Sequence, residues 1–309
     1  MIARRVELTW GSPAVVVALA LLAGWGVGAA VALGSPVAAL AVAGGLVATW
    51  AITRSVEASL LGLIVVASVL PYTVIPLRVG VALTALDAVM AAIVLGWLLR
   101  HALPARRLEL TAGGFLVVAY LVTAVVALVV GTSYAMPSGA AVRSFLKYVV
   151  AIGLFVVVVD VVRDAATIRR LVRALILGGI VAAVLALAIQ ALPRPNIVDV
   201  LSSLSVVGYP SGPGVLRFLP APNNTYSDTL RAVGTQIDPN VLGGMLMMAA
   251  SLMLAQCFAQ RSVLPRWLLV GGLGLAAVAM VLSQSRASWL GLAAAGGVLA
   301  TIRDRRLWL

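Results

Sequence analysis

The sequence predicts an all-α membrane protein, a polytopic bundle of about ten transmembrane helices with a cytoplasmic N-terminus. Of its 309 residues, 62% are hydrophobic and only 10% are charged, whereas a soluble domain carries about 25% charged residues. The apolar residues form separate runs, most of them close to the roughly 20 residues that cross a bilayer. The basic residues are also distributed unequally between the two sides that these runs define.

The apolar runs give the predicted elements in order. The first follows a basic start but has no clear cleavage site, so it is interpreted as a span and not as a signal peptide. Pro71 and Pro76 interrupt the third run, which favours a broken or partly re-entrant span. A membrane tolerates such a break only inside protein or beside a wet cavity. The predicted spans are 13–33, 36–53, 58–77, 79–99, 110–131, 143–162, 171–191, 238–259, 267–283 and 287–302.

The basic residues support this number of spans. With the N-terminus inside, fifteen arginines fall on the cytoplasmic side, and the other seven of the 22 basic residues fall outside or at outer helix ends. This distribution follows the positive-inside rule. One missed or extra span would reverse every later assignment. We therefore expect a single membrane domain over 1–309, with 192–237 as an extracytoplasmic loop within it.

Composition also argues against several function classes. The net charge of +12 could suggest nucleic acid, but the cations stand in short clusters between apolar runs, which topology explains better than a binding patch does. The single histidine, His101, excludes a His-rich metal site, and the lone Cys257 excludes an internal disulfide. We expect no nucleic-acid partner, no metal and no cofactor.

The connection 192–237 is the only long polar segment. It is rich in Pro, Gly, Ser and Asn and also holds Tyr209, Phe218 and Tyr226. Loops of this length are usually functional or disordered. Its aromatic and apolar residues favour an ordered or membrane-skimming loop.

The loop re-enters the membrane through "RAVGTQIDPNVLGGML". Asp238 is a good helix N-cap, and proline suits the first turn that follows it. Gly243 and Gly244 would allow close helix packing. Arg231 lies shortly before the cap, and a helix N-terminus beside an arginine is a possible anion site. The alternative is simply a well-made helix start.

"SQSRASW" lies between the last two apolar runs and places Arg286 at their outer junction. An isolated arginine there could snorkel toward headgroups, but serines, a glutamine and a tryptophan surround this one. Arg143 and Lys147 lie one turn apart near the outer end of the sixth span. If these helices converge, they form a cationic pocket suited to a lipid-linked phosphate or diphosphate. Its members would be Arg143, Lys147, Arg231 and Arg286.

Asp87 lies within the fourth predicted span. An acid inside a membrane is by default a candidate functional residue. The alternative, which we prefer, is a buried ion-pair partner for Arg78 or Arg143.

Two of these motifs together resemble a known family. "RAVGTQIDPNVLGGML", followed by "SQSRASWLGLAAAGG", resembles the core signature of the O-antigen ligase and O-antigen polymerase superfamily. The resemblance rests on an Arg–Gly stretch, an Asn at a helix start and a Ser-Arg pair near the outer end of a later helix. It covers about residues 140–302 with motifs, and the remainder by hydropathy alone.

The resemblance implies a polytopic protein of the bacterial inner membrane that transfers or polymerises saccharide from an undecaprenyl-diphosphate donor at the outer face. It implies that Arg231 and Arg286 contact the donor diphosphate and that Asn240 shapes the site, and it places Arg143 in the site by position and not by motif. The sequence itself adds Lys147 and Ser285 as candidate substrate-binding residues, because they lie beside Arg143 and Arg286. If the site holds a base, the candidates in the sequence are Asp238 and Asp228. The implied partners are a lipid-linked oligosaccharide, membrane lipid and other envelope-assembly proteins.

The sequence departs from the ligase pattern after the Ser-Arg helix. Ligases continue with another large outer loop, which carries a functional histidine, and with further spans, whereas this chain ends at "RDRRLWL". A separate polypeptide could supply the second half. Two alternatives stay open: a polytopic transporter of a small anion or solute, and an inactive truncated fragment.

Overall fold

The computed structural model describes residues 56–69, 71–72, 84–102, 111–220 and 226–302. The first two predicted spans, 13–33 and 36–53, lie outside the described residues. The chain divides into two compact units: the first includes 87–164, and the second includes 64–74 and 165–309.

The described chain is mostly helical, as predicted. The helices are α3 (Val56–Val69), α4 (Ala85–Ala102), α5 (Ala112–Gly131), α6 (Gly139–Val161), α7 (Ala165–Gln190), α8 (Arg194–Ser203), α9 (Pro239–Cys257), α10 (Arg266–Ser283) and α11 (Arg286–Ile302). Apart from α8, each occupies one of the predicted spans. Among the described residues, α5, α6, α7, α9 and α10 are long and apolar enough to cross a membrane. The protein is therefore a helical membrane protein.

In the first unit, α5 and α6 form a helical hairpin, and a side chain caps the N-terminus of each helix. Thr111 accepts from the backbone N–H of Gly114 at 3.1 Å, and Ser138 accepts from that of Ala141 at 3.2 Å. Such caps satisfy N–H groups that have no partner within the helix.

Two polar contacts join α4 to α6. Asp87 pairs with Lys147 at 2.5 Å, and Trp97, ten residues later, donates to Asp160 at 2.9 Å. Both pairs advance along the chain in the same order, so α4 and α6 run parallel. The predicted topology requires this direction, because the fourth and sixth spans both run from outside to inside.

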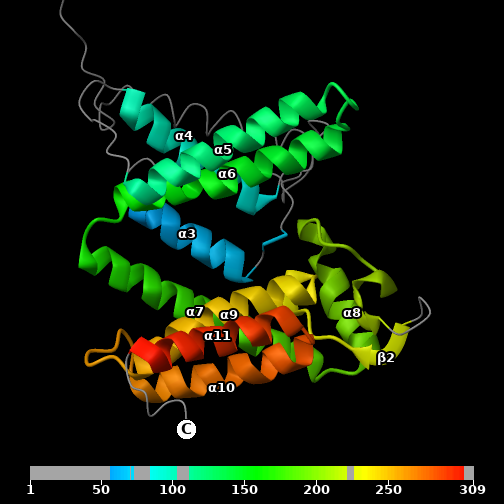
Figure 1. The fold of residues 1–309 in the computed structure, drawn as a ribbon. Coiled ribbons are helices and arrows are strands. Elements are labelled where there is room, and N and C mark those ends of the chain that lie inside the picture. Colours follow the sequence, from blue (N-terminus) through cyan, green and yellow to red (C-terminus); the bar gives the residue numbers. More distant parts are fainter. Residues whose placement is uncertain (1–55, 70, 73–83, 103–110, 221–225, 303–309) are drawn as a thin grey trace, which may run out of the picture. The chain divides into compact units, whose positions relative to one another are not determined.

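In the second unit, α7, α9, α10 and α11 pack side by side as one bundle (Figure 1). Its core is aliphatic and includes the fully buried Ile176, Leu242, Leu246, Met253 and Leu269. Small residues let the helices approach closely. Gly272 of α10, for example, faces Ile180 and Met253, and a Cβ there would lie 2.7 Å from Ile180.

Helix α3 ends at Val69, short of the predicted end at residue 77. Pro71 explains the stop, because proline removes a helical N–H and restricts the residue before it. Gln236 satisfies two carbonyl groups at the end of this helix: its Nε2 donates to the carbonyl oxygens of Ala67 and Ser68 at 3.1 and 3.2 Å. The helix therefore ends within the predicted span, and that end contacts protein; whether the span is broken or re-entrant stays a prediction.

The loop 192–237 is ordered over its described residues, as its composition predicted. It contains α8, short 3₁₀ turns and an antiparallel pair of strands, β1 (Phe218–Pro220) and β2 (Tyr226–Leu230). Ile197 and Leu201 of α8 pack with Ile189, Val215 and Val233 in a small core of their own. Helix α8 was not predicted, although the spacing of Ile197 and Leu201 at i and i+4 is its amphipathic signature.

Contacts also define the two ends of this bundle. At one end of the bundle, the loop end, helices α7 and α10 end and helices α9 and α11 begin. There Gln190 donates to the carbonyl of Leu230, and the N–H of Ala232 to that of Leu282. At the opposite end, Arg173 near the start of α7 donates to the carbonyl of Val263, between α9 and α10. These contacts agree with the alternating directions that the predicted spans require.

Candidate functional site

A cavity of about 640 Å³ opens at the loop end of the second unit. Its walls come from β1, the first turns of α9 and the junction between α10 and α11. The lining residues are Leu219, Pro220, Arg231, Asn240, Gly244, Met247, Gln284, Ser285, Arg286, Ala287 and Ser288. Four residues singled out from the sequence, Arg231, Asn240, Ser285 and Arg286, thus lie around one cavity.

Arg231 is held by three acceptors. Its Nε donates to the carbonyl of Ser283 at 2.9 Å, and its Nη2 to Oδ1 of Asn240 at 3.0 Å and to the carbonyl of Gln284 at 3.4 Å. No described residue accepts from Nη1. The guanidinium is therefore fixed in place by Nε and Nη2 while Nη1 stays available to a ligand.

Burial lowers the pKa of Arg231, and the negative charge of Asp238 opposes that effect. Arginine does not lose its proton in proteins, so the group remains cationic at physiological pH. The cavity therefore keeps this positive charge even though part of the guanidinium is desolvated.

Arg286 is presented by a sharp turn between two helices. Gln284 ends α10 with φ 54°, a left-handed conformation that non-glycine residues adopt rarely. The chain reverses there, and Arg286 is the first residue of α11. Its exposed side chain forms no hydrogen bond or ion pair with any described residue, so all five of its N–H donors are free for a ligand.

Ser285 and Ser288 line the cavity next to Arg286. Both are 3% exposed, and their hydroxyls lie 2.9 Å apart. They pack against Gly243 of α9, where an added Cβ would lie 2.5 Å from Oγ of Ser288. Gly243 therefore packs two helices closely, as predicted. Gly244 differs from that expectation, because no atom lies within 4 Å of its would-be Cβ and it lines the cavity.

The two helix N-termini at this end differ in how they are capped. Asp238 accepts from the N–H groups of Asn240 and Val241 at 2.7 and 3.4 Å, so the start of α9 already holds a carboxylate. At the start of α11, the N–H groups of Arg286 and Ala287 have no acceptor among the described residues. The open helix N-terminus is that of α11, and not that of α9 as the sequence had suggested.

Asp238 itself is not among the residues that line the cavity. Its capping bonds confirm the helix-start reading that the sequence left open. Nothing in the structure tests its predicted role as a base.

The segment that carries Arg231 and Asn240 is anchored from behind. Besides the bonds from Gln236 to α3, the hydroxyl of Tyr209 donates to the carbonyl of Thr235 at 3.0 Å and accepts from the N–H of Tyr72 at 3.4 Å. Burial raises the pKa of Tyr209 to about 12, so this phenol stays protonated. Between the anchor and the cap, Ile237 has φ 60°, a strained conformation for a β-branched residue.

Arg143 and Lys147 lie on α6, in the first unit. Their predicted convergence with Arg231 and Arg286 in one pocket therefore stays a prediction. Lys147 pairs with Asp87, so its charge is compensated. Asp87 thus has an ion-pair partner in Lys147, as preferred in kind, although Lys147 was not among the partners expected. Arg78, one of the two expected partners, lies outside the described residues. Nε of Arg143 is buried without a hydrogen-bond acceptor among the described residues.

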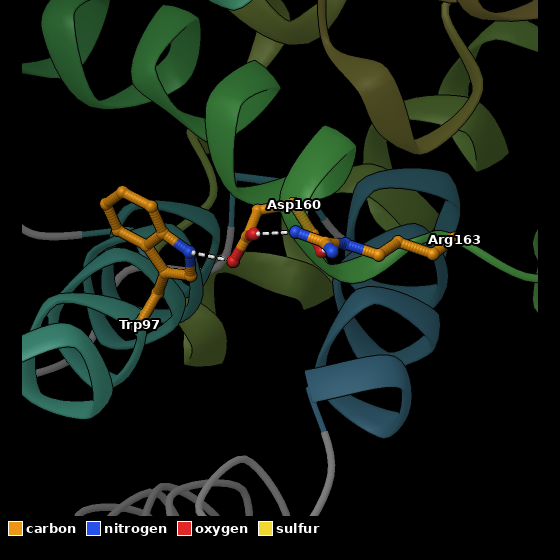
Figure 2. A network of polar contacts seen from close by, with 3 residues as sticks. All are labelled: Trp97, Asp160 and Arg163. Atoms are coloured by element: carbon orange, nitrogen blue, oxygen red, sulfur yellow. Dashed lines mark hydrogen bonds and ion pairs between the residues drawn. The ribbon is translucent and has the colours of Figure 1, made fainter. Parts of the chain in front are cut away.

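A second polar network in this unit was not predicted from the sequence. Figure 2 shows Asp160 between Trp97 and Arg163, with Nη2 of Arg163 2.8 Å from the Asp160 carboxylate. Arg163 also donates through Nε to the Asp160 backbone carbonyl at 2.9 Å. The i,i+3 spacing of Asp160 and Arg163 was the available signal. The network ties the end of α6 to α4 and holds no free cation.

Among the described residues, no three of His, Cys, Asp and Glu lie close enough to hold a metal ion. No family model, curated protein or solved structure matches this chain.

Proposed function

We propose that this cavity binds the diphosphate of a polyprenyl-linked saccharide and that the protein transfers the saccharide to an acceptor hydroxyl, in the manner of an O-antigen ligase or polymerase. One observation carries the proposal. Arg231 and Arg286, from different elements, line the same cavity, and Arg286 has no partner among the described residues. The chemistry of transfer comes from the sequence resemblance.

The free donors of the cavity suit a diphosphate. Arg286 offers its whole guanidinium, Arg231 offers Nη1, and the start of α11 offers two backbone N–H groups. Arginine binds phosphate oxygens in a bidentate manner, and a helix N-terminus favours an anion. Cations already in place stabilise the charge that builds on the departing diphosphate without reorganisation during the reaction.

The cavity also has an apolar wall, which suits a lipid carrier. Leu219, Pro220 and Met247 line it together with the arginines, so an anionic group and an attached hydrocarbon chain could be bound at once. The cavity lies at the ends of the helices, where a membrane helix meets the headgroup region. We propose that this is the outer face of a bacterial inner membrane, in a multi-pass chain of ten spans with a cytoplasmic N-terminus.

In the proposed transfer, the acceptor oxygen bonds to the anomeric carbon, and the bond from that carbon to the diphosphate oxygen breaks. The diphosphate leaves with the bonding electrons, and the arginines stabilise its charge. The acceptor hydroxyl releases its proton to bulk water. The described residues that line the cavity include no carboxylate or histidine, so we assign them charge stabilisation alone.

Transport of a small anion is the second candidate function, and the position of the cavity favours it less. Transporters hold substrate near the bilayer midplane, between broken helices. Here the cavity opens at the loop end of the bundle, and Asp87, the acid expected within a span, is paired with Lys147.

The function is tested by glycan transfer in cells at matched protein levels. Loss of one donor to a developing anion lowers rate by about 100- to 1,000-fold, so we expect that loss in Arg286→Ala. The control is Arg194→Ala, because Arg194 lies in the same loop region but outside the cavity lining and donates to the carbonyl of Asp228. Equal transfer by wild type and Arg286→Ala would reject the proposal.

A further inference from the structure

The end of the second unit opposite the cavity carries a second group of cations. Arg169, Arg170 and Arg173 occupy the first turns of α7, and Arg261 and Arg266 flank the connection between α9 and α10. All five side chains are exposed. We call these five residues the basic end surface.

One contact brings the two parts of this surface together. Nε of Arg173 donates to the carbonyl of Val263 at 3.1 Å, which places the N-terminal part of α7 around Arg173 beside the α9–α10 connection. Arg169 and Arg173 lie on the same face of α7, because they are four residues apart. The surface therefore offers guanidinium groups from two elements at one edge of the bundle.

The charges of Arg169, Arg261 and Arg266 have no compensating partner among the described residues. Neither 165–198 nor 239–302 contains an Asp or Glu, and the nearest acid along the chain is Asp164, just before α7. No described residue forms a hydrogen bond or ion pair with the side chains of Arg169, Arg261 or Arg266. A solvated surface usually mixes both signs of charge, so this one calls for an anionic partner.

Large apolar side chains stand among the arginines. Ile168, Phe258 and Trp267 are 48%, 38% and 75% exposed. Trp267 directly follows Arg266 at the start of α10, and tryptophan is enriched where membrane helices meet the headgroups. An interface of exposed apolar groups with cations fits a lipid surface, in which acyl chains lie beneath phosphodiesters.

We propose that the basic end surface binds the phosphodiester headgroups of anionic phospholipids. The guanidinium groups of α7 and of the α9–α10 connection bind headgroup oxygens, and Trp267 and Phe258 contact the acyl region. Arginine is the only cation at this surface, and its planar fork matches a phosphate better than lysine does. This site is separate from the cavity, and the proposal does not depend on glycosyl transfer.

The test is a titration of the purified full chain with lipid in neutral detergent. The quantity measured at each lipid concentration is the midpoint temperature of thermal unfolding. Phosphatidylglycerol is the anionic probe, phosphatidylcholine the neutral probe, and inorganic phosphate the free anion. A ligand that binds the folded state raises the midpoint as its concentration exceeds its Kd. We expect phosphatidylglycerol to raise the midpoint, with an increment that shrinks as salt is added, because salt screens surface charges.

The test variant is Arg169→Gln/Arg261→Gln, which removes one arginine from each element. The control, Arg194→Gln/Arg217→Gln, removes two arginines at the loop end. Each basic residue near an anionic surface contributes about fivefold in affinity, so the test variant should bind phosphatidylglycerol on the order of 30-fold more weakly, and the control nearly as tightly as wild type. Each increment is measured against the same variant without lipid, so a change in baseline stability cancels.

Three results would overturn the proposal: equal stabilisation of wild type by both lipids, equal loss of affinity in test and control variants, or full stabilisation by inorganic phosphate alone. If the glutamine variant does not fold, Arg169→Lys/Arg261→Lys replaces it. That variant keeps the charge, so it should keep the preference for phosphatidylglycerol and its dependence on salt. Loss of either would contradict the proposal.

Discussion

Nη2 of Arg231 lies 3.0 Å from Oδ1 of Asn240. This bond joins the segment that precedes α9 to the first turn of α9 and orients the arginine across the cavity. With Oδ1 occupied, the amide group of Asn240 has two N–H donors left, and no described residue accepts them. The pair thus fixes one cation of the cavity and adds a neutral donor beside it.

Asn240→Asp tests whether the cavity selects anions. Aspartate still accepts from Arg231, so the unfolding midpoint should change little. The new negative charge beside a bound diphosphate should lower its affinity by at least about tenfold, as expected for charges about 4 Å apart in a partly hydrated site. Isothermal titration with a soluble diphosphate ligand measures the effect. Affinity equal to that of wild type would show that the anion does not bind next to Asn240.

Gly243 and Gly244 are neighbours, but the same substitution should change the stability of the protein much more at Gly243 than at Gly244. Gly243→Ala places a methyl group 2.5 Å from Oγ of Ser288 and should destabilise the protein by about 1–3 kcal/mol. Gly244→Ala meets open space and should change stability by less than about 1 kcal/mol. Unfolding in a mild detergent compares the two, and equal destabilisation would contradict the packing described at Gly243.

A larger side chain at position 244 separates packing from binding. Gly244→Leu projects into the cavity and should abolish ligand binding while the folded yield stays close to that of wild type. A loss of yield with ligand binding intact in the folded fraction would instead place residue 244 in the helix interface.

The two ends of the second unit should face opposite sides of the membrane. Ser205 and Gln260 are exposed residues at the loop end and the opposite end. In a Cys257→Ser background, Ser205→Cys should react with an impermeant thiol reagent in intact cells, and Gln260→Cys only after lysis. The reverse pattern would overturn the predicted orientation. Ser285 is unsuited to this experiment because it is buried.

The helices were the predictable part of the fold, because long apolar runs and the placement of arginines constrain where a chain can cross lipid. The end of α3 was predictable from Pro71, but its anchoring by Gln236 was not, since 166 residues of chain separate Gln236 from the end of the helix. The same limit applies to Lys147, whose partner Asp87 lies on another helix. Sequence spacing identifies neighbours within a helix and not contacts between helices.

Within the candidate site, the motifs predicted which residues gather but not how they bond. Arg231 and Arg286 were expected in one site and do line one cavity. The start of α9 is capped, whereas the start of α11 is open. This difference depends on which N–H groups the Asp238 carboxylate reaches, and therefore on the local backbone geometry. The contrast between Gly243 and Gly244 likewise depends on the rotation of α9 against the Ser285–Ser288 turn, which composition does not determine.

The central claim is that Arg286 binds the diphosphate of a lipid-linked donor, and binding of undecaprenyl diphosphate to the purified full chain tests it most directly. Arg286→Ala should bind at least about tenfold more weakly than wild type, because a hydrogen-bonded charge contributes about 1.5–3 kcal/mol. Arg286→Lys should also be impaired, since it keeps the charge but loses the bidentate fork. Arg194→Ala, outside the cavity lining, should bind as wild type does. Wild-type affinity in both Arg286 variants would contradict the claim and leave Arg286 as an arginine that merely reaches toward headgroups.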